Sequence, residues 1–169
     1  LYMIKIYTDG STRIENRRGA ENEGGWGVVV YENDKVIDAH SEQIGNTTNN
    51  ECELAAIFWA ISNYATKAQW NAPTIYSDSE YAINCVTKWY KNWETNDWKT
   101  SKHEKVANVD LISAITNYLY HQGYYANFEK VKGHSNIEGN VIADKLATGV
   151  LKPEEVMGDL DCKNQKNII

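Results

Sequence analysis

Four carboxylates are the residues of this sequence whose types and positions could do chemistry. Asp9 and Asp78 each follow a short strand-like stretch, Glu53 stands near the start of an alanine-rich helical stretch, and Asp144 lies in the last helical stretch. Taken singly, each has an ordinary explanation. An aspartate before glycine or serine is usually a turn residue, and a glutamate early in a helix is favoured by the helix dipole. Their interest depends on whether the fold brings them together.

The elements that must position these carboxylates follow from the apolar periodicity. The pattern predicts strands over residues 3–9, 26–31, 35–40, 74–77 and 127–132, and helices over residues 49–68, 80–89, 109–122 and 137–148. Three successive strands with short turns indicate an antiparallel meander. The later alternation of strand and helix indicates parallel pairing through right-handed crossovers, so we predict a mixed α/β fold.

Local signals predict where several elements begin and end. Asp9-Gly10-Ser11 reads as a turn that closes the first strand. Asn49 or Asn50 is expected to cap the first long helix, and Ser135 or Asn136 the last one.

Length and composition bound the class of protein. A chain of 169 residues suits a single domain, which we assign to residues 1–150, with 151–169 as a polar tail. The net charge of -6 argues against a generic nucleic-acid binder, although a local basic stripe can still follow a phosphate backbone. The odd number of cysteines, without a CxxC pair, indicates a reducing compartment. We find no membrane-length apolar run and no signal-peptide pattern, and expect a soluble, cytoplasmic monomer.

Residues 88–105 combine tryptophans with local positive charge. Trp89, Trp93 and Trp98 are interleaved with five lysines and three acidic residues, a local balance of about +2 in an acidic protein. One interpretation is a helical protrusion whose tryptophans pack on the domain. The other is a handle that meets a phosphate backbone and stacks on sugars or bases. The sequence leaves both open.

If the first and fourth strands are parallel neighbours, Asp9 and Asp78 emerge at one edge of the sheet, where open α/β sheets place their sites. Helices on that sheet could bring Glu53 and Asp144 to the same place. An all-oxygen cluster selects Mg²⁺ or Mn²⁺ over zinc. Two such ions can support phosphodiester hydrolysis. His134, in a loop before the last helix, could accept or pass a proton there.

In these respects the sequence resembles type I ribonuclease H, which cuts the RNA strand of RNA–DNA hybrids. The matching motifs are YTDGS at 7–11, TNNECEL at 48–54, SDS at 77–79, residues 89–100, VANVD at 106–110, and VKGH at 131–134 continuing to Asp144. The resemblance implies a mixed five-stranded sheet flanked by helices. It implies a catalytic domain over residues 1–150 that yields 3′-hydroxyl and 5′-phosphate products. Its catalytic residues would be Asp9, Glu53, Asp78, His134 and Asp144, and the four carboxylates would hold two Mg²⁺ ions, with Mn²⁺ as a substitute.

The resemblance also implies contacts with the hybrid. Asn49 and Asn50 match positions that contact ribose 2′-hydroxyls or bases, and Ser11 and Thr12 lie near the RNA strand. The 2′-hydroxyl distinguishes RNA from DNA at such a site. Two further groups of residues match positions that contact the DNA strand. Thr48 and Asn108 match positions that hold a DNA phosphate, and Tyr81, Trp93 and Ser101 match a channel that grips the strand.

Three departures from the family pattern remove positive charge or add negative charge near the substrate. They are Asn46 in place of an arginine, Glu80 in place of an uncharged residue, and a less basic handle. We therefore expect weaker hybrid binding and a different salt dependence, with the chemistry retained. The alternatives are a hybrid-binding module with little turnover and a related nuclease of the same fold acting on another nucleic acid. A pure binder, however, gains nothing from negative charge that faces a phosphate.

Overall fold

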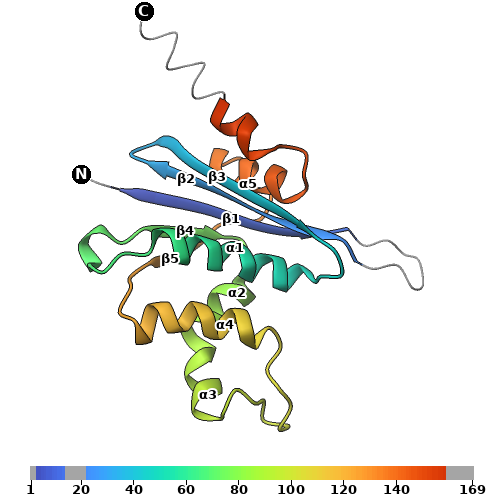
Figure 1. Ribbon diagram of the computed structural model, residues 1–169, viewed down its shortest axis with the longest axis vertical. Coiled ribbons are helices and arrows are strands. Elements are labelled where there is room, and N and C mark those ends of the chain that lie inside the picture. The colour runs from blue at the N-terminus through green and yellow to red at the C-terminus, as the bar shows by residue number, and fades with distance from the viewer. Residues whose placement is uncertain (1–2, 14–21, 159–169) are drawn as a thin grey trace, which may run out of the picture.

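The structure is a computed structural model that describes residues 3–13 and 22–158. It contains a five-stranded sheet in the order β3-β2-β1-β4-β5 (Figure 1). The strands are β1 (Ile4–Thr12), β2 (Gly24–Glu32), β3 (Lys35–Ile44), β4 (Thr74–Ser77) and β5 (Asn127–Lys130). β1, β2 and β3 pair antiparallel, whereas β4 pairs parallel with both β1 and β5. The predicted mixed sheet, with its meander, is confirmed.

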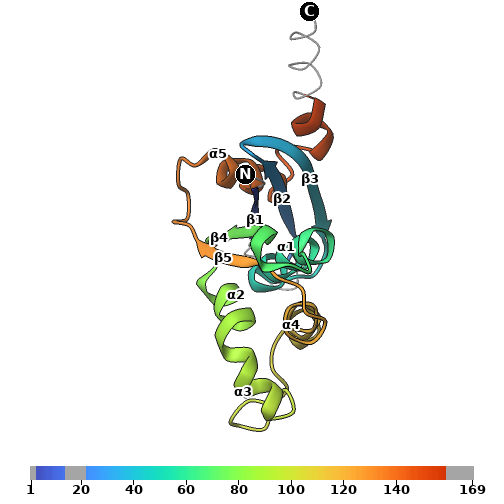
Figure 2. The ribbon, with the colours of Figure 1, turned by 90° about the vertical axis from the view of Figure 1, so that its left-hand side faces the viewer.

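Helices cover both faces of this sheet. They are α1 (Asn49–Tyr64), α2 (Glu80–Asn84), α3 (Tyr90–Thr95), α4 (Val109–Thr116) and α5 (Glu138–Ala147), and π-helical turns at Cys85–Trp89 and Asn117–His121 extend α2 into α3 and lengthen α4. α1 and α5 lie on opposite faces of the sheet, and α3 projects away from it together with the loop that leads to α4 (Figure 2). The predicted protrusion is therefore present.

The alternation of side chains along β1 divides the core into two layers. Ile4 and Ile6 are buried in the layer that contains α1, while Tyr7 packs in the layer that contains Ala143 and Leu146 of α5. Successive side chains of a strand point to opposite faces, so one strand serves both layers. Burying an aliphatic side chain of this size stabilises the fold by about 1.5–3 kcal/mol.

The prediction of a turn at Asp9-Gly10-Ser11 is wrong. β1 continues to Thr12, and Gly10 pairs with Trp26 of β2 inside the sheet. A Cβ at Gly10 would lie 2.5 Å from the backbone nitrogen of Glu53. The glycine therefore allows α1 to pack closely on β1. From the local sequence, a glycine needed for close packing looks the same as a glycine needed for a turn.

The predicted helix caps are also wrong. Thr48 is the N-cap of α1, and its Oγ1 accepts a hydrogen bond of 3.2 Å from the backbone N–H of Glu51. Asn49 and Asn50 are the first two residues of the helix. At α5 the N-cap position is Ile137, without a side-chain cap. Threonine caps a helix nearly as well as asparagine does. Capping preference therefore does not choose among Thr48, Asn49 and Asn50, and the path of the backbone does.

Other boundaries shift by tertiary packing. α1 ends at Tyr64 instead of near residue 68, and the helical run that begins at Glu80 reaches Thr95. In the region predicted as a polar tail, residues 153–158 are helical and Val156 is buried against α5. The domain boundary at residue 150 stays a prediction.

Two of the three cysteines lie in the described part of the chain. Cys52 and Cys85 are both buried and free, and Cys162 lies outside the described residues. No helix in the described ranges combines the length and the apolarity that a bilayer crossing requires.

Gly27→Ala should lower the free energy of unfolding by about 1–3 kcal/mol, because an added methyl group overpacks the interface between β2 and α5. A Cβ there would lie 2.5 Å from Cβ of Leu146 and 2.6 Å from the carbonyl oxygen of Ala143. Gly45→Ala is the matched control, since a Cβ at Gly45 meets nothing within 4 Å. Urea denaturation of both variants measures the difference, and equal midpoints would contradict the close packing.

Candidate active site

Three of the predicted carboxylates meet at one end of the sheet, near the carboxyl ends of the inner strands β1 and β4. Oxygen atoms of Asp9, Glu53 and Asp78 all lie within 4.8 Å of one another. The parallel pairing of β1 with β4 explains two of them. Tyr7 is in register with Tyr76, so Asp9 and Asp78, each two residues further along, reach the same level of the sheet. The predicted neighbourhood of the first and fourth strands is confirmed.

Glu53 reaches this end of the sheet from α1, in the layer of the core opposite to that of α5. It lies in the second turn of α1 and is only 3% exposed. The missing side chain at Gly10 allows the α1 backbone at Cys52 and Glu53 to lie directly against β1. The backbone N–H of Gly10 also donates a hydrogen bond of 3.0 Å to Oδ1 of Asp9. Gly10 therefore both admits Glu53 and orients Asp9.

Burial of these acids changes their protonation. Burial is the main cause that raises the pKa of Asp9 from 3.8 to about 7, and the charge of Asp78 adds to it. Burial also raises the pKa of Glu53, and the charges of Asp9 and Asp78 add to that shift. Oε2 of Glu53 is buried and has no hydrogen-bond partner among the described residues. The site thus contains negative oxygens that the protein itself leaves incompletely satisfied.

Asp144 and His134 complete the surroundings of this cluster. Both line a cavity of about 170 Å³ together with Asp9 and Asp78. A side-chain hydrogen bond with Asp144 further raises the pKa of Asp9. Asp144 lies outside the group of three whose oxygens are all within 4.8 Å of one another. The structure therefore brings the four predicted carboxylates to one site, three of them as a compact group.

Asn140 is a site residue that the sequence did not assign. It is buried one turn before Asp144 on α5, lines the same cavity, and its Nδ2 donates a hydrogen bond of 3.2 Å to Oγ of Ser135. This bond ties α5 to the loop that carries His134, whose φ of 54° is left-handed. The available signal was the i, i+4 spacing of Asn140 and Asp144, which places both on one face of a helix.

The donor set fits a hard divalent cation. Carboxylate oxygens suit Mg²⁺ and Mn²⁺, whereas zinc sites use mainly histidine and cysteine. Acids this close repel one another with energies of a few kcal/mol per pair at an effective dielectric constant of about 20. A divalent ion held by these acids would offset that repulsion, and Oε2 of Glu53, which has no hydrogen-bond partner among the described residues, fits such a ligand.

The predicted DNA channel contains a ladder of aromatic rings on the protruding helices. The rings of Tyr81 and Trp89 have centroids 6.1 Å apart, and those of Trp89 and Trp93 are 5.9 Å apart. Trp93 is half-buried and packs against the core, whereas Trp89 is 40% exposed. Nδ2 of Asn108 donates to the Tyr81 hydroxyl at 3.4 Å, which links the predicted phosphate contact to the channel.

The tryptophans of the protrusion confirm in part the interpretation in which they pack on the domain, whereas a handle that binds substrate stays a prediction. Trp98, like Trp93, packs against the core, and Trp89 presents an open ring. Ser101 lies on the exposed turn after Trp98, and no hydrogen bond or ring contact found in residues 22–158 joins it to the ladder. Its place in a DNA channel stays a prediction.

The other predicted substrate contacts lie on α1 and β1, the elements that carry Glu53 and Asp9, or directly before α1. Thr48, Asn49 and Asn50 are exposed at the start of α1, while Ser11 and Thr12 lie half-buried at the end of β1. Their roles stay predictions.

Glu80, which was expected to add negative charge near the substrate, has a partner. Nζ of Lys130 lies 3.3 Å from its Oε2. This exposed pair offsets part of the charge on which the expectation of weaker hybrid binding rests.

The sequence and the fold are both similar to those of known proteins. Residues 2–152 match the family described as RNase H. A ribonuclease H of Orientia tsutsugamushi is 38% identical over 147 residues, 86% of this chain and 80% of the relative. A ribonuclease H of Syntrophomonas wolfei is 38% identical over 154 residues, 88% of this chain and 96% of the relative. The solution structure of the PFV RNase H domain is 25% identical with a TM-score of 0.71, covering 88% of this chain and 93% of that domain.

Asp9→Asn should flatten the pH dependence of stability in the presence of a chelator. Because the pKa of Asp9 is about 7 when folded and its ordinary value is 3.8, the folded protein binds more protons than the unfolded chain between these values. The wild-type free energy of unfolding should therefore fall, relative to the variant, by about 2–4 kcal/mol from pH 4 to pH 7.5. Urea denaturation across this range measures it.

The control for this experiment is Asp97→Asn, at a side chain that is 92% exposed. Its stability should follow that of the wild type at every pH. Parallel curves for wild type and Asp9→Asn would show that Asp9 titrates in its ordinary range.

Proposed function

The chain belongs to the ribonuclease H family, and we propose that Asp9, Glu53, Asp78 and Asp144 form the metal site with which it cleaves the RNA strand of RNA–DNA hybrids. The protein is a ribonuclease H, an endonuclease for that strand. The observation that supports the assignment of the site is the compact group of three acids, two of them buried, whose oxygens lie within 4.8 Å of one another.

The site would hold two Mg²⁺ ions, for which Mn²⁺ could substitute. Asp9 and Asp78, which lie at the same level of the sheet, would bind most directly, and Glu53 and Asp144 would complete the two sites. When bound, such ions activate a water molecule and stabilise the leaving oxygen of the phosphodiester. Hydrolysis in this way leaves a 3′-hydroxyl and a 5′-phosphate.

The chain's own residues orient this chemistry. The hydrogen bond from Gly10 holds one oxygen of Asp9, and the packing of α1 on β1 holds Glu53 in place. His134, exposed at the mouth of the cavity, would accept or pass a proton during hydrolysis or help to release the product. The bond from Asn140 to Ser135 positions the loop that carries this histidine.

Substrate selection would divide between the two strands. Asn49 and Asn50, with Ser11 and Thr12, would read the RNA strand through its 2′-hydroxyls. Thr48 and Asn108 would hold a DNA phosphate, and Tyr81, Trp93 and Ser101 would line the DNA channel. Asn108 and Lys105 line a cavity of about 480 Å³ together with Glu51, which stands one turn after Thr48. We propose that the enzyme acts as a cytoplasmic monomer.

Asp9→Asn should lower hybrid cleavage by about a thousandfold or more while leaving hybrid binding measurable, because it removes a metal ligand worth several kcal/mol of transition-state stabilisation. The assay uses a labelled RNA–DNA hybrid, duplex DNA and duplex RNA, each with magnesium and with chelator. Only the hybrid with magnesium should be cut. Binding without cutting by the wild type would favour the module without turnover, and cutting of another duplex would favour a related nuclease. Retained cutting by the variant would remove Asp9 from the site.

Trp89→Ala should weaken hybrid binding by about tenfold, since stacking on an exposed aromatic ring contributes about 1–3 kcal/mol per base. The single-turnover cleavage rate at saturating enzyme should stay unchanged, because Trp89 lies outside the carboxylate cavity. Trp70→Ala is the control, as this ring is 82% exposed but lies just before β4, at the opposite end of that strand from Asp78. If both variants bind alike, Trp89 does not contact the substrate.

A further inference from the structure

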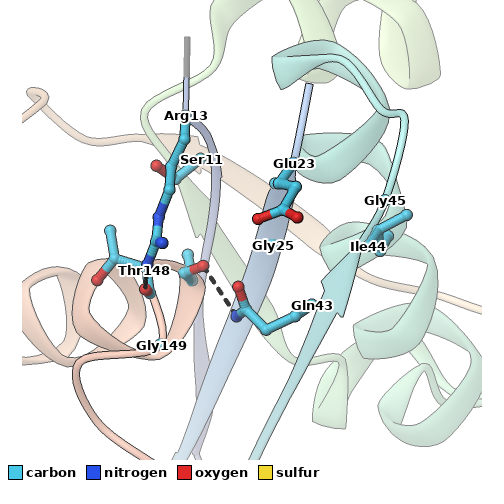
Figure 3. A pocket seen from close by; sticks show the side chains of 11 residues that line it. Ser11, Arg13, Glu23, Gly25, Gln43, Ile44, Gly45, Thr148 and Gly149 are labelled. Atoms are coloured by element: carbon cyan, nitrogen blue, oxygen red, sulfur yellow. Dashed lines mark hydrogen bonds between the residues drawn. The ribbon is translucent and has the colours of Figure 1, made fainter. Parts of the chain in front are cut away.

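A second cavity, of about 440 Å³, adjoins the end of the sheet that carries the carboxylates (Figure 3). The side chains that matter here are those of Ser11 and Arg13 after β1, Glu23 before β2, Gln43 of β3, and the α5 end at Ala147 and Thr148. None of these residues belongs to the carboxylate cavity. The cavity is therefore a separate recess beside the active site.

Two elements lead from the carboxylates to this recess. Along β1 the side chains of Asp9 and Ser11 are two residues apart, so they point to the same side of the strand. Arg13 follows directly after the strand, where its backbone N–H donates a hydrogen bond of 2.8 Å to the carbonyl oxygen of Glu23. Along α5 the recess begins about one turn after Asp144, at Ala147 and Thr148. A backbone that lies across Asp9 and Asp144 and continues in this direction enters the recess.

Arg13 places a positive charge at the recess, and the described residues offer it no ion-pair partner. Its Nη2 donates a hydrogen bond of 3.3 Å to the carbonyl oxygen of Thr148, and the side chain is otherwise exposed. In residues 3–13 and 22–158 no carboxylate lies within ion-pair distance of it, although Glu23 lines the same recess. A guanidinium has five N–H donors in a planar fork that suits a phosphate, and most of them are free here.

We propose that this recess receives the RNA backbone beside the scissile phosphate and that Arg13 binds one of its phosphates, as a positioning residue. The inference rests on the proposed function. Four residues of strand span about 13 Å, so the contacted phosphate lies within about four nucleotides of the scissile one, at 3.4 Å per nucleotide.

The location favours the RNA strand over the DNA strand. The proposed DNA contacts Tyr81 and Trp93 lie on α2 and α3, across the sheet from α5, whose end lines the recess (Figure 2). The proposed DNA contact Thr48 is nearer, since Gly45, three residues before it, also lines the recess. The strand that crosses Asp9 and Asp144 is the one that is cut.

Glu23 allows a test in which two substitutions act in opposite directions. A phosphate in the recess is attracted by Arg13 and repelled by the carboxylate of Glu23. Arg13→Ala should therefore weaken hybrid binding and Glu23→Gln should strengthen it. A merely structural role of Arg13, fastening β1 to α5 through Thr148, predicts no gain from Glu23→Gln.

The first measurement is the dissociation constant of a fluorescent RNA–DNA hybrid across salt concentrations, in chelator so that nothing is cut. Arg13→Ala should raise the dissociation constant about tenfold at low salt. It should also reduce the magnitude of the slope of the log binding constant against the log salt concentration by about 0.7–0.9. Arg13→Lys should recover part of the loss. Lys35→Ala, which removes one charge from the opposite end of β3, is the control and should change neither. Equal behaviour of Arg13→Ala and Lys35→Ala would overturn the proposal.

The second measurement locates the contact. Single phosphates of either strand are replaced by neutral methylphosphonates, and binding is compared between wild type and Arg13→Ala. One replacement within about four nucleotides of the scissile bond in the RNA strand should weaken wild-type binding and leave the variant unaffected. Coupling to the DNA strand instead would overturn the proposal. Because both measurements record binding, failure of the wild type to cut would count against the proposed function and leave the Arg13 result independent.

Discussion

The mutual repulsion of buried carboxylates is the constraint that the rest of this structure accommodates. Asp9 and Glu53 are 6% and 3% exposed, and their oxygens lie within 4.8 Å of one another and of Asp78. At such distances a pair of like charges costs about 4 kcal/mol even at an effective dielectric constant of 20. Without cations, burial and the neighbouring charges raise the pKa of both buried acids. The same repulsion gives a divalent ion its affinity, so instability and catalysis have one physical origin.

The free energy that offsets this cost comes from the two apolar layers on either side of the sheet. Each layer is tight because strand residues without side chains admit helix backbones: Gly10 admits α1, and Gly27 admits α5. Asp9, Glu53 and Asp144 are therefore attached to elements that pack in the core, whereas a polar contact, from Asn140 to Ser135, positions the loop of His134. This division suits a site in which the ligands must remain fixed while a proton is accepted and a product leaves.

An acidic protein that binds a polyanion must place its few cations carefully. The described part of the chain concentrates negative charge at the carboxylates and pairs other charges, as at Glu80 with Lys130 and Asp97 with Lys99. Arg13 is a cation beside the site without such a partner in these ranges. With the proposed contacts, substrate binding would depend on aromatic rings, amides and individual cations more than on a broad basic surface, which would lower the dependence of binding on salt.

Periodicity alone determined the five strands, the helices and their mixed pairing, because alternation and 3.6-residue spacing report which side of an element is buried. The family motifs added the identities of the four acids. The end of β1 was misjudged from sequence because a glycine signals a turn and a close approach equally. The cap of α1 and the extent of the helix after Asp78 were misjudged because local signals do not include the tertiary packing that sets these boundaries. Asn140 and Arg13 acquired their meaning only in three dimensions. Sequence thus determined which groups could do chemistry, whereas the tertiary structure decided which of them meet, because proximity depends on how helices pack across the sheet.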